Sequence, residues 1–399
     1  MRSLLVTLAF LTAFGIGHVA VARLLRAIFP RRAAWVWAAL ALGNLMLLGL
    51  PVVFFAHSGH ASALLRTLLG PPFIIWQGFV LVYGPLSILG AAAWLAAHAL
   101  RATRARFTAF WRAPTLLVLT GFAALIVLGV PGALVPLAVR DVEVDIPGLP
   151  AEFDGYRIAL LSDLHVGLFA RTGRLQRIVA ATNALDADVI TIAGDLVDDE
   201  PIHIPKLVRG LAGLRARDGV HAVLGNHDIY GGAAPRLAAR PDLPFRLLVN
   251  ESVRIRRGAA ILVLAGLGDP AAAHFAAPDD DATARFAPDW DRALAGTRPG
   301  DIVVALAHDP ALFDEAAARG LALTLSGHTH GGQLGFHRLH WSLAGLFLPR
   351  HMGFYRDETG ASALYVTTGA GYWVLPVRVG VIPEIIHLTL RRPRTLTRP

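Results

Sequence analysis

The sequence predicts a chain of two parts, about four transmembrane α-helices followed by an α/β layered domain. Three observations lead to this prediction. The 399 residues are 54% hydrophobic, more apolar than an ordinary soluble enzyme. No acidic residue occurs before Asp141. From Asp141 onward, short apolar runs that end in polar side chains alternate with amphipathic segments, which is typical of α/β domains.

Four apolar stretches without a charged side chain predict the membrane part. Each is near or above the ~20 residues that a helix needs to cross a bilayer. The predicted spans lie near residues 4–22, 33–56, 71–98 and 114–138. We therefore assign residues 1–140 to a transmembrane region, 141–390 to the α/β domain and 391–399 to a disordered tail. A cleaved signal peptide over the first stretch is the alternative, and it would leave three spans.

The distribution of arginine predicts the orientation of these spans. Eight arginines fall in the first and third connections, whereas the second connection has only Arg66. Because positively charged loops stay in the cytoplasm, the domain after the fourth span is expected on the outer face of the membrane.

The net charge of +8 is divided unequally between the two parts. Eleven arginines and no acidic residue occur up to Arg140, so the remaining 26 basic and 29 acidic residues give the second part a charge of −3. Without a basic excess to neutralise phosphates, that part is not expected to bind nucleic acid. The absence of cysteine excludes disulfides and thiolate metal sites.

Five predicted strands of the second part each end in Asp, His or Asn, and segments such as 174–183 and 205–215 between them read as helices. In chain order, the strands are followed by Asp163 and His165, by Asp195, by Asn226, His227 and Asp228, by His308, and by His328 and His330. Side chains two positions apart at a strand end point the same way, and strand carboxyl ends meet at one edge of an α/β sheet. Since these residue types are metal ligands, the sequence predicts a metal site there.

These motifs closely resemble the signature of the calcineurin-like metallophosphoesterases. They stand in the family's order: Asp163-Leu164-His165, Gly194-Asp195-Leu196-Val197-Asp198, Gly225-Asn226-His227-Asp228, His308 and Gly327-His328-Thr329-His330. The resemblance covers Asp141 to about Leu390, and the lead-in from Leu149 looks like that of the bacterial membrane-attached branch. It implies a four-layer αββα sandwich with two divalent metal ions. The expected location is the bacterial inner membrane, multi-pass, with the domain on the periplasmic or extracellular face.

The resemblance also implies a role for each residue. Asp163, His165 and His330 would hold the first ion, Asn226, His308 and His328 the second, and Asp195 would bridge the two. His227 would donate a proton to the leaving oxygen, and Asp228 would orient its imidazole. The alternative for His227 is a structural role in the turn. Asp198 matches the motif but is not assigned as a ligand, and a loop or helix-cap role is at least as well supported for it. A donor set of nitrogen and oxygen suits Mn, Fe or Zn.

The predicted function is a membrane-anchored phosphoesterase in which metal-activated hydroxide attacks a phosphate ester. We expect a phosphate ester of diester, lipid-linked or pyrophosphate type, with a soluble nucleotide left open as substrate, and membrane lipid as a partner. The unusually apolar segment 336–354 after His330 either packs locally or receives lipid. A catalytically silent metal- or lipid-binding receptor or scaffold with the same fold is the main alternative, and the retained His227 argues against it. Too few intramembrane polar groups are present for a second alternative, a four-helix transporter.

Overall fold

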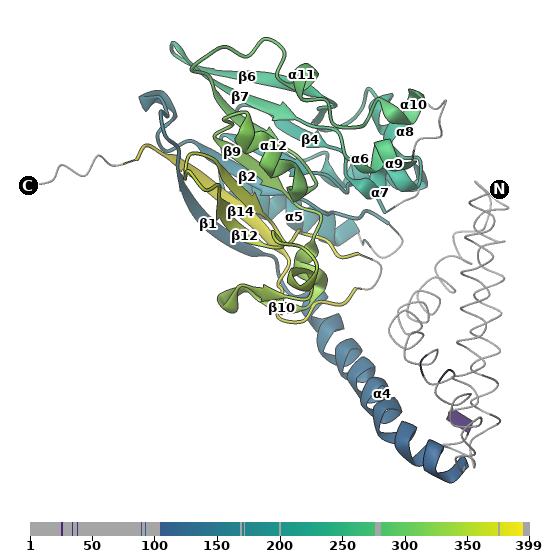
Figure 1. Cartoon of the computed structure of the whole chain (residues 1–399). Helices are drawn as coiled ribbons and strands as arrows, with labels where there is room; N and C mark the ends of the chain where they lie inside the picture. Colours follow the sequence, from purple (N-terminus) through teal and green to yellow (C-terminus); the bar gives the residue numbers. More distant parts are fainter. Residues whose placement is uncertain are drawn as a thin grey trace, which may run out of the picture. The chain divides into compact units, whose positions relative to one another are not determined.

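The computed structural model describes residues 104–393, except 168–169, 171, 199–200, 276–280 and 374–375, together with six isolated positions nearer the amino terminus. The chain divides into two compact units, Met1–Val127 and Leu128–Pro399. The helix α4 (Arg104–Leu134) runs from the first unit into the second, and every element described below belongs to the second unit (Figure 1).

The first of two six-stranded sheets has the strand order β1-β14-β2-β3-β4-β5. Its strands are β1 (Ala138–Asp145), β14 (Glu384–Arg391), β2 (Arg157–Leu161), β3 (Val189–Ala193), β4 (Val220–Val223) and β5 (Arg246–Leu247). The strands β2 to β5 run parallel to one another, and β14 runs antiparallel to β2. Every residue of β3 is buried, as expected of a parallel strand that is covered on both faces.

The second sheet has the order β12-β13-β9-β8-β7-β6. Its strands are β12 (Gly353–Arg356), β13 (Ala363–Val366), β9 (Leu323–Ser326), β8 (Ile302–Leu306), β7 (Ala260–Gly266) and β6 (Glu251–Arg257). The four inner strands are parallel, and the edge strands β6 and β12 are antiparallel to their neighbours. This sheet therefore also gathers the carboxyl ends of its inner strands at one edge.

Helices and short helical turns connect these strands. The longer segments are α5 (Thr172–Ala184), α6 (Ile204–Leu211), α7 (Asn226–Tyr230), α8 (Ala234–Ala238), α9 (Ala271–Phe275), α10 (Asp281–Ala284), α11 (Trp290–Ala293) and α12 (Phe313–Ala318). The 3-10 turns are η2 (Ala151–Phe153), η3 (Pro201–His203), η4 (Pro310–Leu312), η5 (His330–Gln333), η6 (His337–Leu339) and η7 (Ala344–Leu346). A small hairpin of β10 (Gly335–Phe336) and β11 (Trp341–Ser342) lies between η5 and η7.

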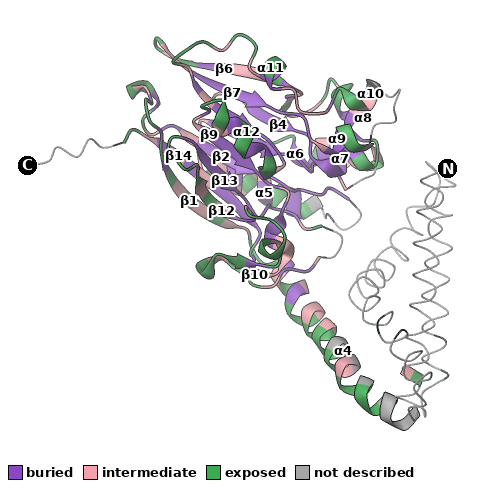
Figure 2. Ribbon diagram, viewed as in Figure 1, coloured by how far each residue is buried: buried purple, intermediate pink, exposed green. Residues whose placement is uncertain are grey.

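The alternation of side chains along the strands produces the layers. In β2, Ile158 and Leu160 face the second sheet, where they join Leu264 and Leu306 in one buried cluster. The alternate residues of β2 and β3 pack on Leu175 of α5 and other helical side chains. A third cluster covers the outer face of the second sheet with α11 and α12. The predicted order of helix, sheet, sheet and helix agrees with this arrangement, and the inner strands of both sheets are mostly buried (Figure 2).

The predicted membrane part is contradicted. Spans near residues 4–22, 33–56 and 71–98 lie outside the described residues, apart from isolated positions. In the part of the chain that the structure describes, none of the helices combines the length and the apolar character needed to cross a membrane. This finding overturns the prediction of four transmembrane helices and of a multi-pass inner-membrane location.

The fourth predicted span, 114–138, shows why a count of uncharged residues misleads. The helix α4 ends at Leu134, and β1 begins at Ala138. Within the second unit, the Gly129 carbonyl accepts a hydrogen bond from the backbone N of Arg378 at 2.8 Å. A Cβ on Gly132 would come within 2.0 Å of the Arg378 carbonyl oxygen. Small apolar residues at the end of α4 thus serve close packing on protein, which a hydropathy rule cannot distinguish from contact with lipid.

Candidate metal centre

The predicted ligands follow inner strands of both sheets. Asp163 and His165 come after β2, Asp195 after β3 and Asn226 after β4. From the second sheet, His308 follows β8, and His328 and His330 follow β9. The structure brings all seven together, because the carboxyl ends of these strands meet at one place between the sheets.

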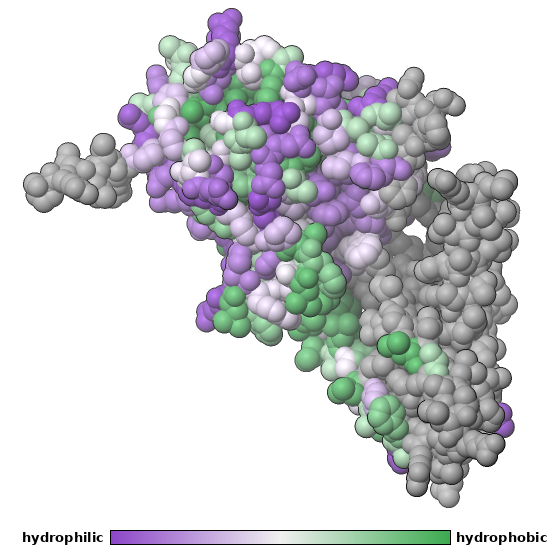
Figure 3. Space-filling model, viewed as in Figure 1, coloured by the Kyte–Doolittle hydropathy of each residue, from purple (hydrophilic) through white to green (hydrophobic). Residues whose placement is uncertain are grey.

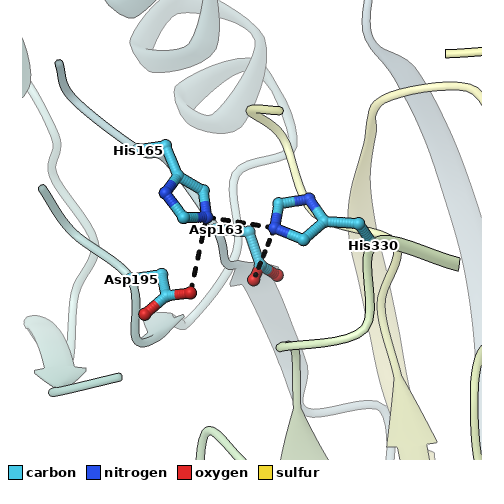
Figure 4. A group of neighbouring side chains, drawn as sticks. All are labelled: Asp163, His165, Asp195 and His330. Carbon is cyan, nitrogen blue, oxygen red and sulfur yellow. Dashed lines mark hydrogen bonds and ion pairs between the residues drawn. The ribbon is translucent and has the colours of Figure 1, made fainter. Parts of the chain in front are cut away.

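Four of the side chains form one buried group, Asp163, His165, Asp195 and His330 (Figure 4). One ligand atom from each lies within 4.8 Å of the others. His165 Nε2 is 3.0 Å from His330 Nε2 and 3.4 Å from Asp195 Oδ2. His330 Nε2 is in turn 3.4 Å from Asp163 Oδ1. Two carboxylates and two imidazoles therefore converge on one small volume.

The other predicted ligands, Asn226, His308 and His328, form a second group beside the first. Asn226 Oδ1 lies 3.1 Å from His308 Nε2 and 2.8 Å from His328 Nδ1. His308 Nε2 is also 3.2 Å from Asp195 Oδ2. Asp195 Oδ2 therefore contacts an imidazole of each group.

The backbone of the centre is strained. Asp163, His165, Asp195, His328 and His330 all have positive φ, between 41° and 74°. Such a left-handed conformation costs a non-glycine residue about 1–3 kcal/mol, and it recurs at functional sites because the surrounding structure holds it. Here the amides of Asp163 and His165 donate to the carbonyls of Gly194 and Asp195, each at 3.0 Å. These cross-strand hydrogen bonds fix the turns that aim the ligands inward.

Two glycines permit the close approach of the turns to the ligands. A Cβ on Gly225 would lie 2.2 Å from Asp195 Oδ1, and one on Gly327 would lie 1.9 Å from Ser162 Oγ. Neither distance is possible for real atoms, so each position requires glycine. The Gly-Asn-His and Gly-His motifs thus begin with glycine for a steric reason.

The charges of the centre depend on one another. Burial opposes ionisation of Asp195, but the His308 and His165 imidazoles outweigh it and hold the Asp195 pKa well below its ordinary value. Burial likewise opposes the charged form of His165, yet Asp195 and Asp198 raise its pKa to about 10. In contrast, burial lowers the His330 pKa, and the positive charges of His165 and Arg378 lower it further. Burial also raises the Asp163 pKa.

The donor atoms fit a bound divalent cation. Asp163 Oδ2 is buried and lacks a hydrogen-bond partner among the described residues. His165 Nε2 and His330 Nε2 face each other at 3.0 Å, and an imidazole nitrogen that carries no proton can bind a cation. A cation between these atoms would satisfy the carboxylate oxygen and both ring nitrogens. Ligands of nitrogen and oxygen alone suit a divalent ion such as Mn, Fe or Zn.

The two predicted catalytic residues lie at the start of α7. The His227 ring centroid is 4.9 Å from that of His165, and the His227 backbone N donates to Asp195 Oδ1 at 2.9 Å. The Asp228 carboxylate accepts hydrogen bonds from the backbone N–H groups of Gly225, Leu196 and Val197 at 2.9–3.2 Å. Burial and the Asp195 charge raise the Asp228 pKa to about 7. The described contacts of Asp228 thus hold the turn, and its predicted contact with the His227 ring stays a prediction.

Two residues contact the predicted ligands without having been predicted to do so: Asp198, which the sequence suggested only for a loop or cap role, and Arg378, which it did not single out. Asp198 Oδ1 lies 3.4 Å from His165 Nδ1, and its place in the Gly-Asp-x-x-Asp motif was the available signal. Arg378 is 1% exposed, and its Nη2 lies 3.3 Å from His330 Nδ1. The same nitrogen donates to the carbonyls of Thr368 and Gly371 at 2.7 and 2.6 Å. No pattern in the sequence connects Arg378 with His330, because Arg378 stands in none of the motifs that mark the ligands.

Comparison with known proteins identifies the family. The model of the calcineurin-like phosphoesterase family matches residues 156–332. A zebrafish (Danio rerio) transmembrane protein with metallophosphoesterase domain is 31% identical over 80% of this chain and 71% of its own length. Uncharacterized metallophosphoesterases of Campylobacter jejuni and Helicobacter pylori are 30% and 34% identical over 69% and 59% of this chain, and over 69% and 59% of their own lengths.

The match with the zebrafish protein extends over most of both chains, and the family match covers the turns that carry all the predicted ligands. These comparisons, together with the buried cluster of carboxylates and imidazoles, agree on one assignment. The chain belongs to the calcineurin-like phosphoesterase family and is a metal-dependent phosphoesterase.

Proposed function

We propose that the centre holds two divalent ions and hydrolyses a phosphodiester that carries an apolar, lipid-type group. The observation that carries the two-ion proposal is the position of Asp195. Its Oδ2 lies 3.4 Å from His165 Nε2 and 3.2 Å from His308 Nε2, so one carboxylate stands between two groups of ligands. A shared ligand is what a pair of ions about 3.5–4 Å apart requires.

The proposed ligand sets follow from the two groups of contacts. Asp163, His165 and His330 would hold the first ion, and their closest ligand atoms are 3.0–3.4 Å apart. The second would be held by Asn226, His308 and His328, in which Asn226 Oδ1 contacts both imidazoles. Asp195 would contribute to both ions. Ions bound there would supply a strong nucleophile near neutral pH and neutralise charge on the phosphate oxygens.

The residues around the ligands would orient groups and move a proton. We propose that His227, which lies beside His165, donates a proton to the leaving oxygen. Asp228 would position His227 through the backbone, because its carboxylate holds the amide of Gly225 and those of Leu196 and Val197. Asp198, 3.4 Å from His165 Nδ1, would keep that ring turned with its Nε2 toward Asp195.

The proposal of a lipid-type group is supported by the segment that follows the His330 turn. Most of the exposed apolar side chains of the segment 336–354 precede β12, and we call this narrower part, residues 336–348, the apolar segment. Its large apolar side chains are 37–81% exposed, namely Phe336, Leu339, Trp341, Leu343, Leu346, Phe347 and Leu348. Apolar colours gather around β10 in Figure 3. Exposure of this kind argues against local core packing and favours contact with an apolar ligand.

A panel of esters would test the proposed reaction. Purified protein loaded with Mn, Fe or Zn would be assayed against monoesters, diesters and pyrophosphate-type esters, each with and without an acyl chain in detergent micelles. We expect the highest kcat/KM for an acylated diester. Asp195→Asn protein prepared in parallel would reveal contaminating phosphatases. A clear preference for monoesters would refute the diester proposal, and a preference for soluble diesters would refute the lipid-type group.

A charge in the apolar segment would test its role separately. Phe347 is 81% exposed, so Phe347→Asp should fold normally and lower the ratio of activity on acylated to soluble diester by about tenfold, because a charge opposes burial of an acyl chain. Ile202→Asp is the matched control, since Ile202 is 50% exposed and lies in η3. An unchanged ratio in Phe347→Asp would count against the segment.

A further inference from the structure

Two half-exposed aromatic rings flank the imidazole of His227. The Tyr230 ring lies 5.3 Å from it at an interplanar angle of 74°, and the Trp373 ring lies 5.7 Å away at 57°. Tyr230 is 46% exposed and Trp373 is 43% exposed. Neither ring stacks flat on the imidazole, and both keep surface open to solvent beside the proposed proton donor.

The backbone of Trp373 is held by a side chain from the His330 turn. Gln333 Nε2 donates to the Trp373 carbonyl at 3.0 Å, and Gln333 Oε1 accepts from the Trp373 N–H at 2.9 Å. One amide side chain therefore satisfies both backbone groups of Trp373. This pairing ties the loop between β13 and β14 to the turn that carries a predicted metal ligand.

Core packing does not explain this arrangement. Gln333 adopts a left-handed φ of 56°, which is unfavourable for a residue with a side chain. Trp373, which Gln333 positions, remains nearly half exposed, so the strain is not offset by burial of the ring. A strained residue that fixes an exposed ring near reacting groups indicates a ligand for that ring.

We propose that Tyr230 and Trp373 form a leaving-group subsite for a flat aromatic group, with Gln333 as its positioning residue. The inference rests on the proposed role of His227. The group bonded to the oxygen that His227 protonates must lie next to the His227 ring, where these two rings stand. Aromatic faces of tryptophan and tyrosine favour a flat ring over a saturated one through stacking. The apolar segment would then serve the group that stays on phosphorus.

Two symmetrical diesters that differ only in their rings would test the subsite. Dibenzyl phosphate has a flat aromatic ring, and bis(cyclohexylmethyl) phosphate has a saturated ring of the same size. Both leaving oxygens are bonded to CH2, and any difference in intrinsic leaving-group ability is removed by comparing the benzyl preference of the wild-type protein with that of Trp373→Leu. We expect metal-loaded protein to favour the benzyl ester about tenfold in kcat/KM, on the order of one stacking contact.

Substitutions of Trp373 should change that preference. Trp373→Phe keeps a flat ring and should retain most of the preference for the benzyl ester. Trp373→Leu keeps apolar area but no flat ring, so it should lose this preference, mainly through a higher KM for the benzyl ester. Gln333→Leu removes both amide contacts with Trp373 and should reduce the preference for the benzyl ester, but by less than Trp373→Leu does. The matched control is Phe354→Leu, because Phe354 is 37% exposed on β12, outside the apolar segment.

A binding measurement gives a readout independent of turnover. Benzylphosphonate and cyclohexylmethylphosphonate cannot be hydrolysed, and calorimetry on the metal-loaded protein would give the Kd of each. We expect benzylphosphonate to bind about tenfold more tightly, and Trp373→Leu to abolish the difference.

The results of these experiments distinguish failure of the proposed subsite from failure of the proposed diester reaction. Equal turnover and equal binding of the benzyl and cyclohexylmethyl compounds, unchanged in Trp373→Leu, would overturn the subsite while the diester reaction stands. Failure to hydrolyse any phosphodiester would overturn the proposed function and the subsite with it.

Discussion

At the scale of single residues, Asp195 is the side chain on which the centre depends most. Its Oδ2 contacts His165 and His308, and its Oδ1 accepts the backbone N–H of His227. Asp195→Asn keeps the shape but removes the charge. We expect a loss of kcat/KM of at least about 10³-fold, beyond the 10- to 100-fold typical of residues that only support a ligand. Steady-state kinetics on a diester would measure it.

The matched control for this change is Asp314→Asn. Asp314 is an exposed carboxylate of α12 that pairs with Arg350 and is not one of the proposed ligands, so its replacement should leave kinetics within about twofold. If another conservative change among the seven predicted ligands reduced activity more than Asp195→Asn, the shared position of Asp195 would lose its support.

The proposed proton donor gives a second prediction at this scale. His227→Ala should retain bound metal, because His227 is not among the proposed ligands, while kcat falls by roughly 10² to 10⁴. The loss should shrink for esters with good leaving groups, since these need least protonation. Metal content and a series of aryl diesters would be measured together. An equal loss across the series would assign His227 a different role.

At the scale of elements, the turns after the strands determine whether the ligands can meet. A Cβ on Gly225 would come within 2.2 Å of Asp195 Oδ1 and 2.8 Å of His308 Nε2. Gly225→Ala should therefore displace both side chains and lower activity and metal affinity by roughly 10- to 100-fold. Gly173→Ala in α5 is the control, since nothing lies within 4 Å of its Cβ. Near-normal metal binding by Gly225→Ala would show that the turn tolerates a side chain.

The loop 367–371 supports the centre from the second sheet. The amides of Ala370 and Gly371 donate to the carbonyls of Ser162 and Asp163, each at 2.9 Å. Glu384 anchors the loop, because its Oε1 accepts from Thr367 Oγ1 at 3.1 Å and from the Thr368 N–H at 2.8 Å. Glu384 also pairs with Arg140 of β1.

Loss of this anchor should be measurable as loss of stability. Glu384 is fully buried and Arg140 is one-third exposed, so Glu384→Ala should cost about 2–3 kcal/mol and lower Tm by roughly 5–10 °C. The exposed pair of Glu143 and Arg391 joins the same two strands, and Glu143→Ala should cost less than about 1 kcal/mol. Thermal unfolding would compare the two variants, and equal effects would contradict the anchoring role.

The elements also show which features of the site the sequence could predict. Asp163, His165, His328 and His330 were predictable because strand ends and glycines mark them locally. Arg378, Glu384 and Trp373 were not, since each reaches the centre through contacts between distant segments. Hydrophobic alternation predicts strands, but it carries no information about which loop lies beside which ligand.

At the scale of the whole molecule, the prediction of a layered α/β unit is confirmed, whereas the prediction of a membrane part is contradicted. The buried runs of β2, β3, β8 and β9 have a composition that only a covered sheet accommodates. In contrast, the apolar residues 128–134 at the end of α4 follow the same hydropathy rule as a transmembrane span, although Gly129 and Gly132 pack against the loop at Arg378. Charge and hydropathy alone do not distinguish a helix that crosses a membrane from one that packs closely on protein.

The metal content of the active protein tests the central claim most directly. Elemental analysis of the fully active, metal-loaded chain, with activity measured on the same sample, should give two divalent ions per chain. Asn226→Ala should retain about one ion, because it removes a proposed ligand of the second ion alone. One ion per chain in the fully active wild-type protein would contradict the dinuclear centre.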